Sequence, residues 1–224
     1  MNNGIRISDL YDSVPAYLTA LFESAEYPWQ VLPRLKSFIS LLLECGIEGY
    51  SLLKEGVLVG KNVSIAPTAT IEAPAIIGEG TELRPGAYLR GNVIVGKGCV
   101  IGNATELKHC ILLDSVQVPH YNYVGDSVLG NRAHMGAGAI CSNLKSDGTN
   151  VVIRAEQPLD TGLRKVGSFL GDHADIGCGC VLNPGTVVGG QTSVYPLTAL
   201  RGVYPSHAIV KDARTVVPKE EREI

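Results

Sequence analysis

Aliphatic residues recur along the chain at every sixth position from Val59 onward. Because an amphipathic helix requires a period near 3.6, this repeat predicts a coil of short strands, with each aliphatic side chain turned inward. Four positions after each aliphatic residue the side chain is usually small or β-branched, which suits a corner between flat faces. We therefore predict a mainly β fold. The positions that share this register are Val59, Ile65, Ile71, Ile77, Leu83, Leu89, Val95, Ile101, Leu107 and Leu113.

The repeat slips after Leu113, resumes at Tyr123, Leu129, Met135 and Cys141, and fails from residue 144 to 166. It then returns and runs to Leu200, so residues 144–166 are an excursion from the solenoid rather than its end. Loops longer than about 12–15 residues in a compact domain are commonly functional.

Residues 1–55 follow a different pattern, in which apolar residues from Val14 onward are spaced by three and four positions. This spacing predicts two or three short helices. Pro28 suits a first helical turn, Gly46 suits a helix end, and Trp29 is expected to be a packing anchor. We divide the chain into a helical segment (1–55), a β-solenoid (56–211) and a tail (212–224).

Composition limits the classes of partner. The net charge is −3 and the sequence contains no Lys/Arg-rich run, so neither nucleic acid nor an acidic membrane is expected as a partner. Six cysteines without a CxxC pair, and a start without a charged segment leading into an apolar signal core, favour a reduced, cytoplasmic protein. No apolar run is long enough to cross a membrane.

The stretch VPHYNYVGDSVLG, Val118 to Gly130, interrupts the small and aliphatic pattern with polar and aromatic residues. His120 is its candidate base, because an imidazole changes protonation near neutral pH and can accept a proton from an attacking amine. Taken alone, a single histidine more often simply ends a strand, so the interpretation of His120 as a base depends on its surroundings.

Five motifs together suggest a family. They are LRPGAYLRGN (83–92), IGNATELK (101–108), PHYNYVGD (119–126), MGAGAICSN (135–143) and FLGDHADIGCGCVLNPGTVVG (169–189). From about residue 57 to 211 the chain resembles the hexapeptide-repeat acyltransferases, and within them the acetyltransferase half of the bifunctional N-acetylglucosamine-1-phosphate uridyltransferases. The resemblance implies a single-stranded left-handed parallel β-helix with three strands per coil. It also implies homotrimers with active sites between subunits.

By this resemblance, His120 is the general base that deprotonates the C2 amine of glucosamine 1-phosphate or galactosamine 1-phosphate as it attacks acetyl-CoA. Asp126 and Asn122 are expected to orient neighbouring groups. No metal is expected. The positions implied for substrate binding are Arg84, Arg90, Lys108, Asn122, Tyr123, His134, Asn143 and Lys165. Those implied for acetyl-CoA are Ala137, Cys178, Pro196 and Lys211.

The phosphate-binding arginine stays open between two positions. Arg84 lies in the family's RPG motif, but it is 24 residues before Lys108, where the family has 18. Arg90 is 18 residues before Lys108, which is one coil, so these two side chains should stack and grip one phosphate. Gly136-Ala137-Gly138 lacks bulky side chains, so its backbone N–H groups are expected to stabilise the charge developing on the thioester oxygen.

Other positions depart from the family. His134, Leu144 and Cys178 replace an asparagine, a tyrosine and a serine, which leaves the amino sugar open. There is no N-terminal glycine-rich nucleotide-binding loop, so acyl transfer alone is expected. A non-catalytic scaffold is one alternative. A γ-carbonic-anhydrase-like metalloenzyme is another, although the five histidines lack a closely spaced pair. We expect the 144–166 excursion to reach over a neighbouring subunit's site.

Overall fold

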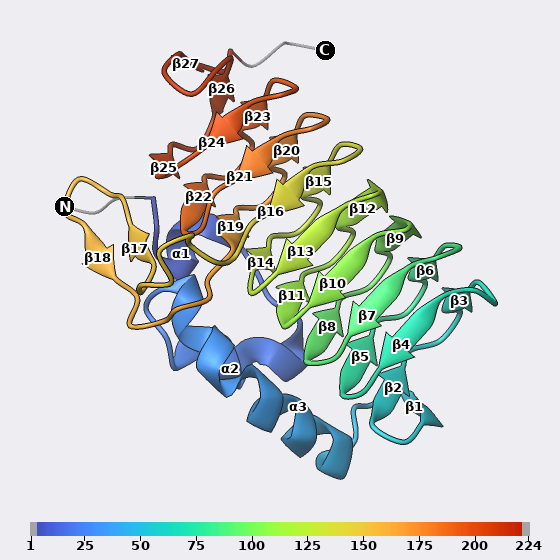
Figure 1. Ribbon diagram of the computed structural model, residues 1–224. Coiled ribbons are helices and arrows are strands. Elements are labelled where there is room, and N and C mark those ends of the chain that lie inside the picture. The colour runs from blue at the N-terminus through green and yellow to red at the C-terminus, as the bar shows by residue number, and fades with distance from the viewer. Residues whose placement is uncertain (1–3, 221–224) are drawn as a thin grey trace.

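The computed structural model describes residues 4–220, which form a β-solenoid of about nine turns flanked by an N-terminal helical segment (Figure 1). This confirms the predicted mainly β class and fits a left-handed β-helix. The helices are α1 (Ile7–Leu10), α2 (Thr19–Glu23) and α3 (Leu32–Cys45), with short 3-10 helices at Ala16–Leu18 and Pro28–Val31.

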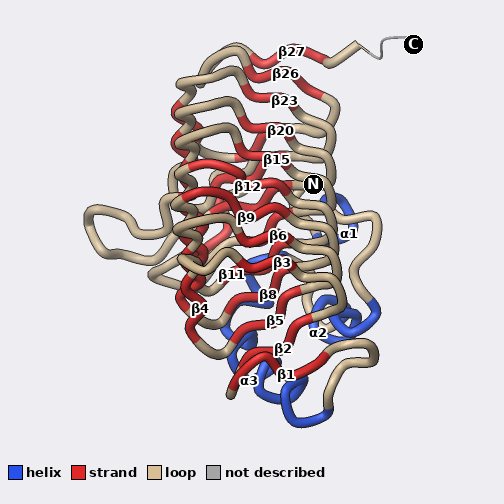
Figure 2. Tube along the Cα trace, turned by 90° about the vertical axis from the view of Figure 1, so that its right-hand side faces the viewer, coloured by secondary structure: helices blue, strands red, loops and turns tan. Residues whose placement is uncertain are grey.

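Three sheets make up the faces of the solenoid, and the coil strands within each are parallel. Sheet A contains β1 (Ser51–Lys54), β2 (Val57–Val59), β5 (Ala75–Ile77), β8 (Val93–Val95), β11 (Cys110–Leu112), β14 (Val128–Leu129), β19 (Ser168–Leu170), β22 (Thr186–Val188) and β25 (Val203–Tyr204). Sheet B, seen face on in Figure 2, contains β3 (Ser64–Ile65), β6 (Glu82–Leu83), β9 (Val100–Asn103), β12 (Gln117–His120), β15 (His134–Met135), β20 (Asp175–Ile176), β23 (Ser193–Val194), β26 (Ala208–Val210) and β27 (Val216–Pro218). Sheet C contains β4 (Thr70–Glu72), β7 (Tyr88–Arg90), β10 (Glu106–Lys108), β13 (Tyr123–Gly125), β16 (Ile140–Cys141), β21 (Val181–Leu182) and β24 (Ala199–Leu200).

The predicted inward register holds as far as Leu107 and is wrong by one residue at the next two assignments. Leu112, not Leu113, pairs with Val95 and joins the inner core. Val124, not Tyr123, pairs with Leu107, so Tyr123 faces outward. The cause is a shorter corner between sheets C and A. Here His109 (φ 50°) makes the turn one residue sooner than in the preceding coil, which shortens the repeat from 18 residues to 17.

The N-terminal segment covers the outer face of sheet A (Figure 1). In the coil strands from β2 to β22 an apolar residue points outward and is buried against this segment, so both faces of these strands are buried. Trp29, 4 % exposed, lies 5.9 Å from Phe169 between ring centroids, which confirms it as a packing anchor. Gly46, at φ 75°, ends α3 as predicted. The outward residues are Leu58, Ile76, Ile94, Ile111, Val128, Phe169 and Val187.

Hydrogen bonds attach the N-terminal segment to the corner between sheets A and B. The buried carboxylate of Asp172 accepts hydrogen bonds from the backbone N–H of Asp12 at 2.9 Å and of Asn131 at 2.6 Å. The Asn131 amide in turn donates to the Ser13 carbonyl at 2.9 Å. Apolar packing therefore holds the segment on sheet A, and these bonds set where it crosses the corner.

The chain leaves the solenoid between β16 and β19 and makes a hairpin of β17 (Val152–Ile153) and β18 (Leu159–Asp160). Val151, Ile153 and Val166 are buried in the cluster that covers sheet A, so the base of this excursion packs on the same chain. Within residues 4–220 no helix is long and apolar enough to span a membrane. The first three residues of the predicted helical segment and the last four of the predicted tail lie outside the described residues.

Candidate active site

His120 lies at the end of β12, exposed, at the corner between sheets B and C. Backbone hydrogen bonds stack later coils on this corner: Gly138 N–H donates to the His120 carbonyl at 3.0 Å, and Gly179 N–H donates to the Ala137 carbonyl at 2.8 Å. Leu197 N–H donates to the Cys178 carbonyl at 2.8 Å. His120 and the predicted acetyl-CoA positions Ala137, Cys178 and Pro196 therefore form one column, which we call the B/C corner column.

Lys211 follows Val210 at the same end of sheet B, one coil beyond Tyr195. Its side chain is exposed, and the chain then turns back into β27. The predicted acetyl-CoA positions thus extend from the coil of Ala137 to the last coil of the solenoid.

Of the three N–H groups predicted to face the thioester oxygen, two are already used. Gly136 N–H donates to the Ile176 carbonyl at 2.7 Å, and Gly138 N–H donates to His120. Within residues 4–220, the Ala137 N–H has no acceptor. Of the N–H groups in this stretch, that of Ala137 is therefore the one left for the thioester oxygen in the described residues, because stacking of the coils takes the other two.

Asn122 points into the solenoid and is 3 % exposed. Its Oδ1 accepts the His120 backbone N–H at 3.1 Å, and its Nδ2 donates to the carbonyls of Gly136 at 2.8 Å and Ala139 at 3.2 Å. These bonds engage both ends of the amide, so its geometry suits an orienting role for the His120 and Ala137 corners rather than direct substrate contact.

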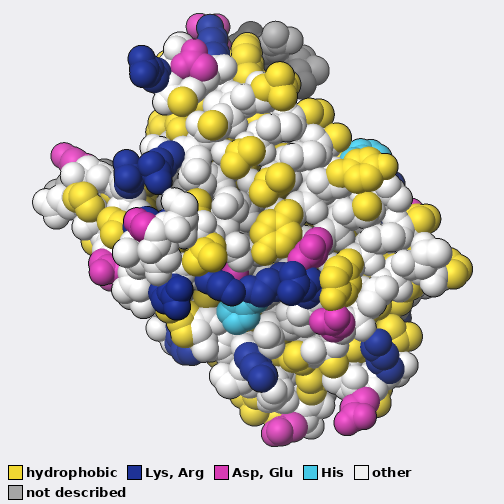
Figure 3. All heavy atoms as spheres, in the orientation of Figure 1, with side chains coloured by type: hydrophobic (Ala, Val, Ile, Leu, Met, Phe, Trp, Pro, Cys, Tyr) yellow, Lys and Arg dark blue, Asp and Glu magenta, His cyan; other side chains and the backbone are white. Residues whose placement is uncertain are grey.

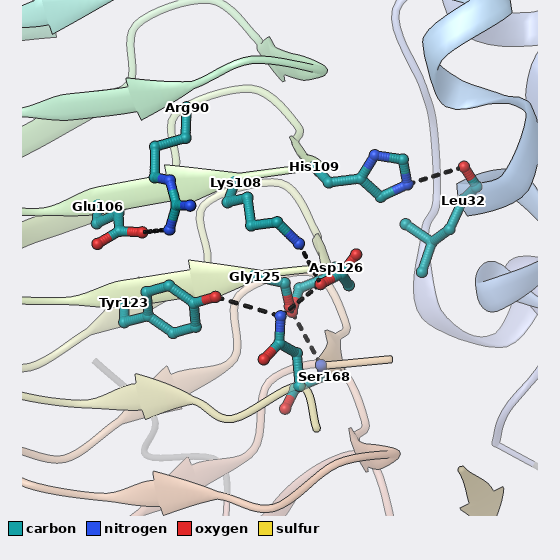
Figure 4. A network of polar contacts seen from close by, with 11 residues as sticks. Leu32, Arg90, Glu106, Lys108, His109, Tyr123, Gly125, Asp126 and Ser168 are labelled. Carbon is teal, nitrogen blue, oxygen red and sulfur yellow. Dashed lines mark hydrogen bonds and ion pairs between the residues drawn. The ribbon is translucent and has the colours of Figure 1, made fainter. Parts of the chain in front are cut away.

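Sheet C carries two cations on its outer face, each paired with a carboxylate (Figure 4). Arg90 forms a 2.7 Å ion pair with Glu106, and Lys108 forms a 3.2 Å ion pair with Asp126. In Figure 3 a band of Lys and Arg side chains crosses this face of the solenoid. Since β7 and β10 pair in register, Lys108 lies one coil beyond Arg90, as the 18-residue spacing predicts.

Tyr123 lies across the same face, and its hydroxyl is linked to Asp126 through the side chain of Asn143. Asn143 Nδ2 donates to the Tyr123 hydroxyl oxygen at 3.2 Å and also to Asp126 Oδ2. Burial, and then the nearby Asp126 carboxylate, raise the pKa of Tyr123, so its phenol keeps its proton. The Asn143 bond uses an oxygen lone pair, which leaves that proton available for a substrate acceptor.

Of three other predicted positions, Arg84 and His134 lie away from this group, and Lys165 lies beside it in the chain. On sheet B, Arg84 pairs with Glu82 at 3.1 Å, and His134 Nδ1 lies 2.8 Å from Asp175 Oδ1. The hydrogen bond from His134 lowers the pKa of Asp175. Lys165 is exposed and bridges to Leu144 at the base of the excursion, one residue before Val166, whose N–H donates to the Asn143 carbonyl.

The remaining histidines have structural or peripheral positions. His109 Nε2–H donates to the Leu32 carbonyl at 3.0 Å, and burial lowers the pKa of His109. His173 and His207 occupy exposed corners. In the described residues, no group of three or more His, Cys, Asp or Glu side chains has a metal-binding arrangement. A cavity of about 340 Å³ beside Tyr11 and Phe22 lies on the helical segment, far along the chain from His120.

Sequence reasoning missed the partners of the charged residues. Glu106 forms an ion pair with Arg90, Asp175 lies within hydrogen-bond distance of His134, and Gly125 provides the space over which the Tyr123 ring lies. The repeat could have revealed Glu106, which stands 18 residues after Tyr88 on the outward positions of sheet C. The 41-residue step from His134 to Asp175 spans the excursion, so its register was not readable from the period.

Parts of the chain are similar in sequence to known proteins. Residues 71–162 match the family described as the GMPPB C-terminal domain. The chain is 33% identical over 97 residues to a bifunctional sugar-1-phosphate nucleotidylyltransferase/acetyltransferase of Sulfurisphaera tokodaii, covering 43% of this chain and 24% of that protein. It is 30% identical over 171 residues to the bifunctional protein GlmU of Methanococcus maripaludis, covering 75% and 42%. The homologues of this chain are GlmU-type nucleotidyltransferase/acetyltransferases.

The chain spans about a quarter of the length of the first curated relatives it matches. It covers more of the uncharacterized acetyltransferase YaiX of Escherichia coli, with 34% identity over 151 residues, 67% of this chain and 66% of that protein. Among solved structures, UDP-N-acetylglucosamine acyltransferase from Campylobacter jejuni matches with a TM-score of 0.49 and 14% identity, over 73% of this chain and 71% of that one.

Proposed function

We propose that this chain is an acetyl-CoA-dependent N-acetyltransferase whose acceptor is an amino sugar with a phosphate at C1, glucosamine 1-phosphate and galactosamine 1-phosphate being the simplest cases. The observation that carries the proposal is the B/C corner column, in which His120 shares one edge with Ala137, Cys178 and Pro196. Tyr123 begins β13 immediately beside that edge, and Arg90 and Lys108 lie two residues further along β7 and β10 on the same outer face of sheet C.

In this proposal the acceptor amine attacks the thioester carbonyl carbon and His120 takes the proton that the amine loses. The carbonyl oxygen gains negative charge as the C–N bond forms, and the Ala137 N–H is the donor available to it. Collapse of this intermediate breaks the C–S bond and releases CoA. Asn122 holds both corners in place, which fixes the base and the donor relative to each other.

For the anomeric phosphate, the structure favours Arg90 over Arg84 as the partner of Lys108. Arg90 and Lys108 are on the same face in adjacent coils, whereas Arg84 is on sheet B and pairs with Glu82. Each cation also pairs with a carboxylate, so a phosphate must share these donors with Glu106 and Asp126. The phenol proton of Tyr123 adds a neutral donor to the site.

The direct test is CoA release from acetyl-CoA with glucosamine 1-phosphate and galactosamine 1-phosphate. His120→Ala should lower the rate by about 10²–10⁴-fold, the usual contribution of a general base. His207→Ala is the matched control, because His207 is also exposed at a corner of the solenoid, and it should retain the native rate. A native protein inert with all amino-sugar phosphates favours a non-catalytic scaffold, which the ion pairing of both cations also allows.

We also propose that the chain forms a homotrimer with the site at the subunit contact. Apolar side chains are exposed along the B/C edge, where Leu197 is 84% and Tyr121 65% exposed, and Ile140 and Val181 stack beside them on sheet C. Sheet A is covered by the chain's own N-terminal segment, which leaves sheets B and C for subunit contact. Light scattering that gives a monomer at micromolar concentration contradicts this proposal.

A further inference from the structure

A polar and aromatic cluster continues on sheet C below the coil of Tyr123 and adds Tyr88 and Glu72 to the residues that the proposed function uses. The Tyr88 hydroxyl donates to Glu72 Oε1 at 2.5 Å. The Arg90 guanidinium carbon lies 6.0 Å from the centroid of the Tyr88 ring, and Arg90 also pairs with Glu106. All of these side chains project from the outer face of β4, β7 and β10.

The register of the strands orders these groups along the solenoid. Tyr88, Glu106 and Tyr123 occupy one column, and Arg90 and Lys108 follow each other in the next. Neighbouring strands are about 4.8 Å apart, so the two tyrosines are separated by roughly 10 Å and the two cations by roughly 5 Å. An acceptor that reaches from Tyr123 to Tyr88 must therefore be longer than a hexose phosphate.

We propose that the acceptor is a nucleoside diphosphate amino sugar, lying along sheet C from His120 down to Tyr88. This inference rests on the proposed function and extends its anomeric phosphate to a diphosphate. Arg90 and Lys108, one coil apart and each able to bind a phosphate, also match the two linked phosphates of a diphosphate.

The lower end of the row has groups suited to a nucleoside. The Tyr88 ring offers a π-face for stacking, reinforced by the guanidinium of Arg90. The carboxylate of Glu72 is exposed beside it and can accept hydrogen bonds from ribose hydroxyls or from base N–H groups. The acetylated amine stays at the other end, near His120, and the chemical step is unchanged.

The experiment compares acceptors that differ only in the nucleotide. UDP-glucosamine and glucosamine 1-phosphate are assayed for kcat/KM by CoA release, with dTDP- and GDP-linked glucosamine covering the choice of base. One nucleotide-linked sugar should exceed glucosamine 1-phosphate by about tenfold or more, the usual effect of one base–aromatic stack. Tyr88→Ala should remove this advantage and leave kcat/KM for glucosamine 1-phosphate within about twofold of native.

Two variants separate the nucleoside contact from general surface effects. Tyr88→Phe keeps the ring but loses the bond to Glu72, so it should retain most of the preference. Arg6→Ala breaks an exposed 3.0 Å ion pair with Glu26 on the helical segment, and it should leave kcat/KM unchanged with both acceptors.

The outcomes distinguish the two proposals. Turnover of glucosamine 1-phosphate at a rate equal to or above every nucleotide sugar overturns the inference and leaves the proposed function standing. Equal losses with both acceptors in Tyr88→Ala also overturn it, because they show a structural role. A native protein inert with every acceptor overturns both proposals together.

Discussion

Gly125→Ala is the substitution that most directly tests the placement of Tyr123. A Cβ at this position would lie 2.5 Å from the Tyr123 hydroxyl oxygen, 2.8 Å from its Cζ and 2.7 Å from Asn143 Nδ2. Non-bonded carbon atoms are comfortable at about 3.5–4.0 Å, so the ring must move by roughly 0.7 Å or more. The obstructed atoms are side-chain ends, so the backbone of β13 should stay in place.

The expected change is large in activity and small in stability. Displacing the ring breaks the 3.2 Å bond from Asn143, a loss of about 1 kcal/mol, which in a chain of this length lowers Tm by about 2–4 °C. The hydroxyl also leaves the position from which it donates to a charged acceptor, a contact of about 1.5–3 kcal/mol. We expect kcat/KM to fall by about 10–100-fold.

The assay pairs CoA release with thermal unfolding, and Gly80→Ala serves as the control. A Cβ on Gly80 meets nothing within 4 Å, but its φ of 69° strains any other residue, so this variant should lose about 1 kcal/mol of stability and no activity. Adding Gly125→Ala to Tyr123→Phe should have little further effect on kcat/KM. Native activity in Gly125→Ala, or full additivity in the double variant, would show that the hydroxyl does not act from this position.

Three further predictions concern assembly of the fold. Asp172→Ala should lower the free energy of unfolding in urea by about 2–3 kcal/mol, because it leaves the N–H groups of Asp12 and Asn131 without an acceptor; an unchanged urea midpoint would contradict this. Burial lowers the pKa of His109 from 6.5, so just below pH 6.5 the unfolded chain takes up a proton at His109 and the folded chain does not. The stability that neutral His109 contributes is therefore complete above pH 6.5 and declines as the pH falls. His109→Gln should make the urea midpoint depend less on pH between about pH 7.5 and 5, and the same pH dependence in both proteins would refute this. Leu197→Asp should convert the proposed trimer to monomers in light scattering with an unchanged circular dichroism spectrum, and a persisting trimer would place the contact elsewhere.

The inward register of the solenoid could be predicted wherever its period stayed constant. The six-residue step placed Ile77, Leu83 and Leu89 correctly, since each has an apolar partner one coil away. It failed at Leu113 and Tyr123, where a corner is one residue shorter. The residues that point inward are their neighbours Leu112 and Val124, and at the first of these positions both candidates are leucines. Neighbouring apolar residues therefore make a slip of one position invisible in the sequence.

The outer partners were harder to predict than the inner ones. Sheet A strands read as continuous apolar triplets, such as Ala75-Ile76-Ile77, and this is the sequence signal of a strand buried on both faces. That signal was present and indicates a covering element, which is the N-terminal segment. The pairing of His134 with Asp175 had no such signal, because it depends on how the chain returns after the excursion.

The covering of sheet A also bears on how the chain unfolds. A bare solenoid is held by contacts between adjacent coils, so it can fray one coil at a time from either end. Here one apolar cluster joins the N-terminal segment to strands from Leu58 in the first coil to Val187 in a late one. The segment packs against successive coils at once. Opening any one of these coils therefore exposes part of an apolar surface that the coils share. Amide exchange should therefore be slowest, and nearly uniform, from β2 to β22 of sheet A rather than only in its central coils.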